Sequence, residues 1–167
     1  MTNNLEKLTI ELAQDEDWPM IWEIFHLIIK PGDTVTFSPN TSFGEAKKIW
    51  MNKDVYTYKA TINNLIVGTY IIKPNFSGLG AHVANGGYMV HPDYRGKKIG
   101  YQMTVHSLNE AIHLGFKAMQ YNLVVATNTS AVKLYERNGF SIIGTIPKSF
   151  NHQKLGYVDS YVMHRFL

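Results

Sequence analysis

Cysteine is absent from the 167-residue chain, and its absence removes whole classes of chemistry. The protein can have no disulfide framework, no thiolate nucleophile and no metal site with cysteine ligands. Long apolar runs are missing too: the stretch from Met20 to Ile29 is interrupted by Glu23 and His26. No window approaches the roughly 18 apolar residues of a membrane-spanning helix. Residues 1–12 contain no apolar run of signal-peptide length, so we expect a cytoplasmic protein that does not bind membranes.

An excess of charge of one sign is also lacking. The chain has 16 Lys and Arg against 13 Asp and Glu, a formal net charge of +3. Proteins that bind nucleic acid gather basic residues on one face, and this small excess does not supply such a face. The seven histidines include no pair at the i, i+4 spacing of a helical zinc site. We therefore expect neither a nucleic-acid partner nor a metal.

The composition that remains is that of a folded domain. Hydrophobic residues make up 45% and charged residues 17% of the chain, which excludes a disordered protein. The length suits one domain over residues 1–167 with a single sizeable core. Periodicity then predicts strands and helices that alternate along most of the chain. The expected strands are 8–12, 55–62, 65–72, 83–90, 119–126, 140–146 and 158–166. The expected helices are 15–29, 42–51, 98–114 and 128–137. This order predicts an α/β fold, with a mixed sheet of about seven strands covered by helices on both faces.

Local signals support several of these boundaries. Asn63-Asn64 lies between two β-rich runs and indicates a hairpin turn. Ser42, with Glu45 three residues later, forms a capping-box pair at the start of the second helix. Residues 31–42 and the polar segment 147–156 are expected to be loops.

The segment Val90 to Tyr101, VHPDYRGKKIGY, carries the sharpest chemical signal. A strand enters a turn rich in Gly and Lys, and the turn opens a helix, so backbone N–H groups and the helix dipole converge on an anion site. Arg95, Lys97 and Lys98 add positive charge, which suits a pyrophosphate. On this segment alone, an ordinary strand–helix turn with solvated lysines explains the pattern equally well. Neither the Walker loop nor the G-x-G-x-x-G dinucleotide fingerprint is present.

A second motif follows one helix and one strand later. Residues 128–140 contain N-x-x-A-x-x-L-Y-x-x-x-G-F. Together with R-G-K-K-I-G, it resembles the Gcn5-related N-acetyltransferase (GNAT) family over essentially the whole chain. The resemblance implies the GNAT fold, with a splay between strands 83–91 and 119–126. In the family loop pattern Q/R-x-x-G-x-G/A, Arg95 and Gly100 match the ends and Lys98 replaces the middle Gly. We expect Lys98 to take an ordinary negative φ.

The same resemblance implies a binding mode for acetyl-CoA. The pantetheine arm would lie in the splay against the backbone of Met89 and Val90, the turn from Arg95 to Tyr101 would hold the pyrophosphate, and Asn128 would contact the arm. For Asn128 the N-cap of the following helix is an equal alternative. The implied cofactor residues are Met89, Val90, Arg95, Gly96, Lys97, Lys98, Ile99, Gly100, Tyr101, Asn122 and Asn128.

Tyr135 is the implied general acid, because in this family the equivalent Tyr faces the thioester sulfur. A phenol, whose ordinary pKa is ~10, stays protonated until the thiolate forms. The alternative is a buried Tyr that packs a helix.

On the acceptor side, many family members carry a Glu on the strand before the loop, whereas residues 82–89 contain no acid. The chain resembles a subgroup of yeast acetyltransferases that act on proline analogues, in which two Asn residues line the transfer site. Asn85 and Asn122 match those positions, with Asn85 orienting an amine or a water. Further candidates for acceptor contacts are Asp33, Tyr58, His152 and Tyr157, with Asp159 as an alternative to Asp33 for attracting an ammonium group.

The sequence therefore predicts an acetyl-CoA-dependent N-acetyltransferase that acts on a primary or secondary amine of a small molecule by direct attack in a ternary complex. Two alternatives stay open: acetylation of protein N-termini or lysines, and a non-catalytic acyl-CoA sensor. Many relatives in this family pair as dimers, which adds a homodimer to the expectations.

Overall fold

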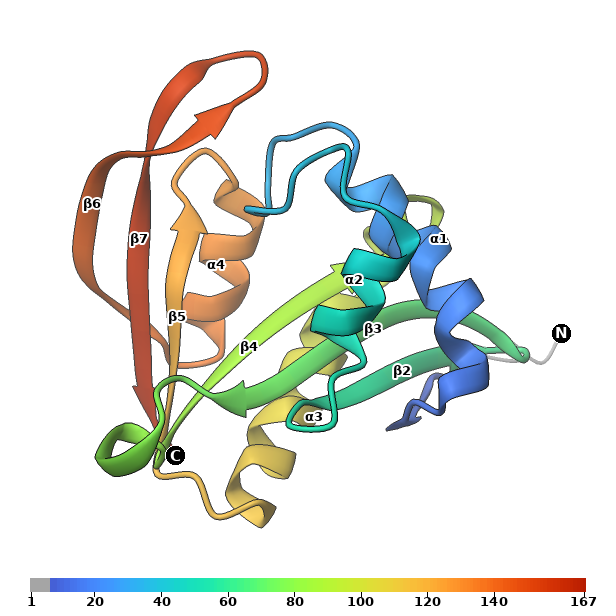
Figure 1. Cartoon of the computed structure of the whole chain (residues 1–167). Helices are drawn as coiled ribbons and strands as arrows, with labels where there is room; N and C mark the ends of the chain where they lie inside the picture. The colour runs from blue at the N-terminus through green and yellow to red at the C-terminus, as the bar shows by residue number, and fades with distance from the viewer. Residues whose placement is uncertain (1–6) are drawn as a thin grey trace, which may run out of the picture.

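A seven-stranded sheet runs through the protein in the computed structural model, which describes residues 7–167 (Figure 1). The strands are β1 (Thr9–Leu12), β2 (Tyr56–Ile62), β3 (Leu65–Pro74), β4 (Val83–Val90), β5 (Ala118–Val125), β6 (Ser141–His152) and β7 (Gly156–Phe166). Their order across the sheet is β1-β2-β3-β4-β5-β7-β6. All neighbours are antiparallel except β4 and β5, which are parallel. The expected mixed sheet is confirmed.

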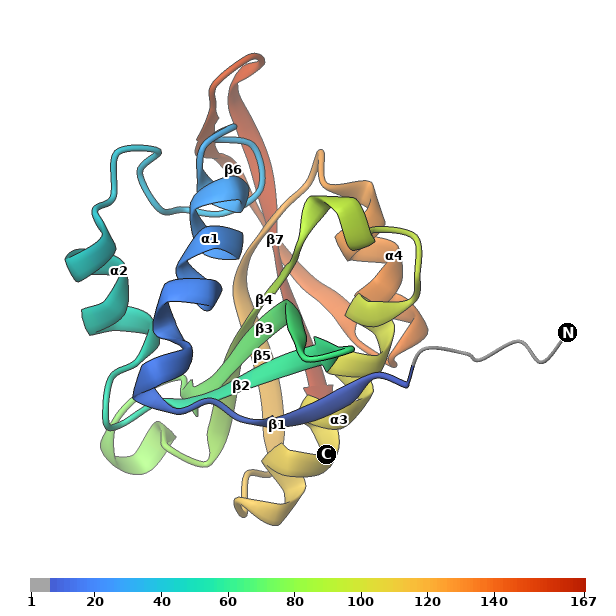
Figure 2. The same cartoon turned by 90° about the vertical axis from the view of Figure 1, so that its right-hand side faces the viewer.

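Helices cover both faces of this sheet (Figure 2). Helices α1 (Trp18–Ile29) and α2 (Phe43–Trp50) lie on one face, and α3 (Ile99–His113) and α4 (Thr129–Arg137) lie on the other. Short 3₁₀ turns occupy Asp15–Asp17, Gly78–Gly80 and Pro92–Tyr94. Of the helices described, none combines the length and the apolar character needed to cross a membrane.

The sheet separates two apolar cores. One core joins α1 and α2 to the sheet and includes Trp18, Phe25, Trp50 and Met89. The other packs α3 and α4 against the opposite face and is rich in tyrosine, with Tyr58, Tyr70 and Tyr121 buried in it. Because successive strand residues point to opposite faces, β3 contributes side chains to both cores, such as Tyr70 to one and Ile71 to the other, and β4 does the same.

The local sequence signals match the observed turns and caps. Asn63 and Asn64 have φ values of 50° and 65°, the pair of positive angles that a two-residue hairpin turn requires. Ser42 Oγ accepts a hydrogen bond from Glu45 N at 3.3 Å, and Glu45 Oε2 accepts one from Ser42 N at 2.8 Å. The reciprocal bonds of the capping box therefore fix the start of α2.

The prediction of a loop over 147–156 was wrong. β6 continues to His152 and pairs with β7 as far as His152↔Gly156, with an irregularity between Ile146 and Phe150. Lys148, with φ 49°, lies inside that irregularity, and its N–H donates to Asp159 Oδ1 at 2.9 Å. The residues of this segment are mostly polar because most of them are exposed, and this polarity led to the prediction of a loop.

The tip of this hairpin contacts the loop after α1. Gln153 N donates to the carbonyl oxygen of Gly32 at 3.1 Å. Gly32 has φ +61°, and a Cβ built there would lie 2.2 Å from Gln153 Cγ. Both the conformation and the close approach require glycine at this position. The contact joins the loop 31–42 to the β6–β7 hairpin.

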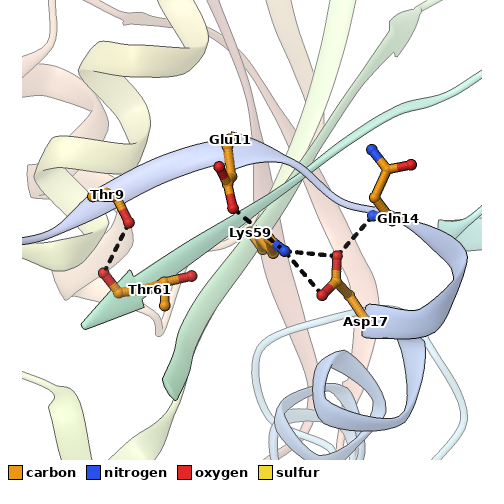
Figure 3. Close-up of polar contacts among 6 residues, drawn as sticks. All are labelled: Thr9, Glu11, Gln14, Asp17, Lys59 and Thr61. Atoms are coloured by element: carbon orange, nitrogen blue, oxygen red, sulfur yellow. Dashed lines mark hydrogen bonds and ion pairs between the residues drawn. The ribbon is translucent and has the colours of Figure 1, made fainter. Parts of the chain in front are cut away.

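A partly buried ion pair anchors α1 to the edge of the sheet (Figure 3). Lys59 of β2 places Nζ 2.9 Å from Asp17 and 3.4 Å from Glu11 Oε1. Asp17 is buried, and its Oδ2 also accepts a hydrogen bond from Gln14 N at 2.7 Å. The hydrogen bond to Asp17 raises the pKa of Lys59 against the opposing effect of burial. Asp17 therefore ties β1, α1 and β2 together at one point.

Replacing Asp17 by Ala should lower the free energy of unfolding by about 2 kcal/mol, because Lys59 and the N–H of Gln14 lose a charged hydrogen-bond partner while Lys59 keeps Glu11. Asp17→Asn should cost less, since its side-chain oxygen still accepts from Gln14. Because the folded-state pKa of Lys59 lies above its unfolded value, the contribution of this amine to stability is present at neutral pH and is lost as pH rises through the folded pKa. Urea denaturation at neutral pH checks the ranking, and a loss below about 0.5 kcal/mol for Asp17→Ala would contradict it.

Candidate active site

The central feature of the candidate site is the divergence of β4 and β5 (Figure 1). The two strands pair only at Val83↔Ala118 and Ala84↔Met119. Beyond these pairs β4 stays paired with β3 up to Val90, and β5 stays paired with β7. One edge of β4 is therefore left without a strand partner, which confirms the expected splay. We call this opening the β4–β5 gap.

The backbone groups of β4 alternate between β3 and the gap. His91 N donates to Val67 O, and Val83 O accepts from Asn75 N, both at 2.8 Å, so odd-numbered residues bond to β3. Even-numbered residues face the other way, as His82 O shows by accepting from Lys117 N at 2.8 Å. The backbone of Val90 therefore faces the gap, whereas that of Met89 faces β3. Met89, which was expected to offer backbone groups to the cofactor, is paired with Thr69 of β3, and its side chain is buried under α1.

The turn after β4 presents open backbone donors at the start of α3. The first helical bond at this end runs from Gln102 N to Lys98 O at 3.0 Å. The N–H groups of Ile99, Gly100 and Tyr101 precede it and are free of intrahelical partners. Arg95, Lys97 and Lys98 are exposed around them, and Lys97 Nζ lies 4.6 Å from the centre of the Tyr94 ring. The turn therefore combines backbone donors, a helix dipole and three cations.

Lys98 adopts a left-handed conformation, with φ 61° and ψ 14°. The expectation of a negative φ was wrong. Gly96 also has a positive φ of 77°, so the turn twice uses the backbone region that favours glycine. Lys98 occupies the position where glycine is usual in this loop pattern, and it keeps the left-handed geometry despite its Cβ. The loop shape is thus preserved at some conformational cost.

Asn128 is the N-cap of α4. Its Oδ1 accepts hydrogen bonds from Ala131 N at 3.4 Å and from Ser130 Oγ at 3.0 Å. Asn128 therefore caps the helix, as one of the two alternatives predicted, and the cap uses only its side-chain oxygen. The Nδ2 group has no partner among residues 7–167, so it is free to contact a ligand.

Three tyrosine rings and Phe140 form a cluster on the α3/α4 face beside the gap. Tyr135 lies 4.5 Å from Tyr121 and 6.0 Å from both Tyr88 and Phe140, measured between ring centres. The hydroxyls of Tyr88 and Tyr121 share a hydrogen bond of 2.8 Å, and Tyr88 also bonds Ser107 Oγ at 2.6 Å. The hydroxyl of Tyr135 makes no hydrogen bond to any described residue. It is the one phenol of the cluster left available.

Burial raises the pKa of all three phenols. For Tyr88 the pKa reaches about 12, because its two hydrogen bonds oppose the effect of burial. Burial, followed by the nearby Tyr88, raises the pKa of Tyr135 above its ordinary value. Tyr135 therefore stays protonated at neutral pH, as a proton donor must.

Four amides lie together on the α1/α2 face at the base of the gap. Asn85 Nδ2 and Asn122 Nδ2 donate to Asn75 Oδ1 at 2.9 and 2.7 Å. Gln120 Nε2 donates to Asn122 Oδ1 at 2.9 Å. The sequence pointed to Asn85 and Asn122 but missed Asn75, which follows the end of β3 and carries no motif. Only the pairing of β3 with β4 brings it here.

The predicted acceptor residues fall into two groups. Asp33 is half-buried in the loop 31–42, next to the contact between Gly32 and the hairpin tip. His152 lies at that tip, where its Nδ1 accepts from Lys154 N at 3.1 Å and Leu155 N at 3.3 Å. Tyr157 is 70% exposed on β7 opposite Asn151. These three residues share one end of the molecule.

Tyr58 lies elsewhere, so its assignment to the acceptor pocket was wrong. Its side chain is only 4% exposed, on the α3 face of β2, and its ring stacks on Tyr70 at 4.7 Å. Its hydroxyl donates to Glu110 Oε2 of α3 at 2.8 Å. The alternating pattern of β2 directs Tyr58 away from α1 and α2. Asp159 likewise uses its carboxylate to hold the backbone of Lys148.

The candidate site therefore has two sides joined by the gap. Tyr135 lies on the α3/α4 face and the amide cluster lies on the α1/α2 face. Within residues 7–167, no group of three His, Asp or Glu side chains is arranged to hold a metal ion.

Comparison with known proteins agrees with this geometry. Residues 18–140 match the sequence model of the Acetyltransferase (GNAT) family. The N-acetyltransferase aca1 of Schizosaccharomyces pombe is 37% identical over 112 residues, which are 65% of this chain and 53% of that protein. The chain thus spans about half the length of this relative.

Solved structures extend the comparison to nearly the whole chain. A GCN5-related N-acetyltransferase from Kribbella flavida superimposes with a TM-score of 0.92 and 38% identity, covering 96% of this chain and 98% of that one. A phosphinothricin acetyltransferase from Sinorhizobium meliloti, solved in complex with acetyl-CoA, has a TM-score of 0.85 at 19% identity, covering 96% of this chain and 88% of that one. At 19% identity, the likeness to the Sinorhizobium meliloti enzyme shows a shared fold. Since the family model covers well over half of the sequence, the chain belongs to the GNAT family of acetyltransferases.

Proposed function

We propose that this protein transfers the acetyl group of acetyl-CoA to an amine of a small molecule, by direct attack in a ternary complex. The observation that carries the proposal is the β4–β5 gap, which links the open donors at the start of α3 to the amide cluster on the other face. A thioester placed in the gap would have a proton donor on one side and an acceptor site on the other. The acetyl-CoA complex of the Sinorhizobium meliloti neighbour supports the choice of co-substrate.

In this proposal the cofactor is held mainly by backbone groups. The free edge of β4, including Val90, would pair with the amide groups of the pantetheine arm as an added strand does. The N–H groups of Ile99, Gly100 and Tyr101 would bind the pyrophosphate, with Arg95, Lys97 and Lys98 supplying charge. Asn128 Nδ2 would donate to the arm while its Oδ1 caps α4.

The transfer step needs one proton donor and one proton acceptor. The amine lone pair forms the C–N bond, the C–S bond breaks, and the departing thiolate takes the proton of the Tyr135 hydroxyl. The amine proton leaves to water, since the chain places no carboxylate on β4. A backbone N–H near Val90 on the gap edge would stabilise the negative charge that develops on the carbonyl oxygen.

For the acceptor we propose a small, partly apolar amine. Asn85 and Asn122 resemble the paired amides of yeast acetyltransferases that act on proline analogues, and the aca1 relative comes from a yeast. A secondary amine held in a ring suits a site built from amides and apolar walls. Asp33, His152 and Tyr157, at the contact between the loop and the hairpin, would border its entrance.

An assay of CoA thiol release with a panel of primary and secondary amines tests the proposal. We expect turnover with at least one small amine, and we expect Gly100→Glu to abolish cofactor binding. A Cβ at Gly100 would meet Leu134 Cδ2 at an ordinary 3.4 Å, so this variant should fold. Binding of CoA without turnover would favour the sensor, and labelling of proteins in a lysate without turnover of small amines would favour protein acetylation.

Tyr135→Phe should lower kcat by ~10²-fold at neutral pH, because a positioned acid contributes at least this much. The KM for acetyl-CoA should change little, since Phe keeps the ring contacts with Tyr88 and Tyr121. Pre-steady-state measurement of the chemical step checks the effect independently of product release. A Phe variant whose chemical step runs at the wild-type rate would remove Tyr135 from the mechanism.

Lys98→Gly should be more stable than Lys98→Ala by about 1 kcal/mol, because only glycine adopts the left-handed conformation without strain. Both variants lose the ammonium group, so the pair separates conformation from charge. Both should weaken CoA binding by the same modest factor, since both lose one cation while the N–H groups of Ile99, Gly100 and Tyr101 that would bind the pyrophosphate remain. Thermal unfolding and CoA titration of the two variants provide the measurement, and equal stabilities would contradict the expectation.

A further inference from the structure

Asn75 bridges the two strands that diverge. Its N–H donates to Val83 O at 2.8 Å, which fixes its backbone beside the first residue of β4. Its side chain then reaches across β4, where Oδ1 accepts from Asn85 Nδ2 at 2.9 Å and from Asn122 Nδ2 of β5 at 2.7 Å. One oxygen atom therefore connects the end of β3 to both sides of the β4–β5 gap.

The bridge lies at the point where the gap begins. The last paired residues are Ala84 and Met119, and Asn85 is the next residue of β4. Past this point no backbone ladder holds the strands at a fixed separation. On the α1/α2 face the two hydrogen bonds to Asn75 continue the connection by one step, as the bond between the Tyr88 and Tyr121 hydroxyls does on the other face.

The bridge also determines which amide atoms stay available. Asn85 and Asn122 both use Nδ2 in the bond to Asn75. Asn122 Oδ1 is occupied by Gln120 Nε2, whereas Asn85 Oδ1 has no partner among the described residues. Asn85 lies on the same face as Gly87 and Met89, toward α1 and α2. Its free carbonyl oxygen is thus an acceptor presented at the base of the gap on the acceptor side.

The Asn75 side chain also carries a group that lowers the stability of the fold, so stability does not explain why Asn is at this position. Asn75 Nδ2 is buried and has no hydrogen-bond partner within residues 7–167. A buried donor without a partner destabilises a fold, and an apolar residue of similar volume avoids that penalty. A side chain that satisfies its neighbours but not itself points to a role in positioning them.

We propose that Asn75 is a positioning residue that orients Asn85 so that its Oδ1 accepts a hydrogen bond from the N–H of the acceptor amine. This inference rests on the proposed function and adds a residue to it. An N–H donated to Asn85 Oδ1 directs the lone pair of the amine away from the carbonyl oxygen and toward the gap, where the thioester would lie. Asn75 acts through Asn85 and does not contact the substrate.

The experiment combines stability, kinetics and a double-mutant cycle. Asn75→Leu should change the thermal midpoint little, because removal of the unpaired Nδ2 offsets the loss of two hydrogen bonds, yet it should reduce kcat/KM for the amine by about tenfold. The dissociation constant for CoA should stay the same. Asn75→Asp keeps oxygen acceptors for both neighbouring amides and should retain kcat/KM within about threefold. Asn109→Ala, on the exposed face of α3, is the matched control and should behave as wild type.

The cycle tests the route of the effect. In an Asn85→Ala background, Asn75→Leu should cause no further loss in kcat/KM, because the oriented group is already gone. Multiplicative losses would overturn the proposal, as would wild-type kcat/KM for Asn75→Leu alone. A lowered thermal midpoint with equal loss in Asn75→Asp would assign Asn75 a structural role.

A second measurement does not depend on turnover. The side-chain NH₂ signals of Asn85 and Asn122 in ¹H–¹⁵N NMR spectra should shift in Asn75→Leu, because each loses its acceptor. Unchanged signals would overturn the bridge even if the enzyme acetylates amines. Wild-type protein that acetylates no amine, with these signals shifted by Asn75→Leu, would count against the proposed function and leave the bridge established.

Discussion

The candidate site depends on one short set of backbone pairs, the two that join β4 to β5. β4 and β5 are parallel neighbours that share two residue pairs and then part, while each keeps its antiparallel partner on the other side. A strand edge inside a sheet normally carries unsatisfied N–H and C=O groups at a considerable cost. Here β3 holds β4 and β7 holds β5, so the gap between the two strands stays open. An extended ligand can satisfy the unpaired N–H and C=O groups along its edge.

The two faces beside the gap have different chemistry because the strand pleat sorts side chains. On the α3/α4 face, aromatic rings exclude water and raise the pKa of Tyr135. On the α1/α2 face, amides supply hydrogen bonds without charge. Amides can orient an amine through hydrogen bonds without adding charge to that face.

Much of the architecture follows from the sequence, and the exceptions have physical causes. Regular periodicity, the Asn63-Asn64 turn and the Ser42 capping box are local signals, and the structure confirms each of them. The end of β6 was predicted as a loop because its residues are mostly polar and exposed, with Phe150 alone buried, so no alternating pattern appears. Tyr58 was misplaced because composition does not reveal which face of β2 a residue occupies.

The site was predictable where a motif fixes geometry and unpredictable where geometry comes from pairing. The turn 95–101 was found from its residues alone, but the left-handed φ of Lys98 was not, since a lysine gives no sign of it. The division between Met89 and Val90 depends on which edge each residue presents, and that follows from the register with β3. Asn75 enters the site through the same register.

The alternation along β4 has a consequence for how such a protein can diversify. The even-numbered residues present main-chain groups to the gap, which are the same whatever the side chain is. The odd-numbered positions instead face α1 and α2: the Asn85 side chain is half-buried there, Met89 is buried in that core, and a Cβ at Gly87 would meet the Trp50 ring at 3.5 Å. One strand thus carries a constant function in its backbone and a variable one in its side chains. Substitution of Asn85 could redirect the enzyme to a new acceptor without rebuilding the surface that the cofactor would use.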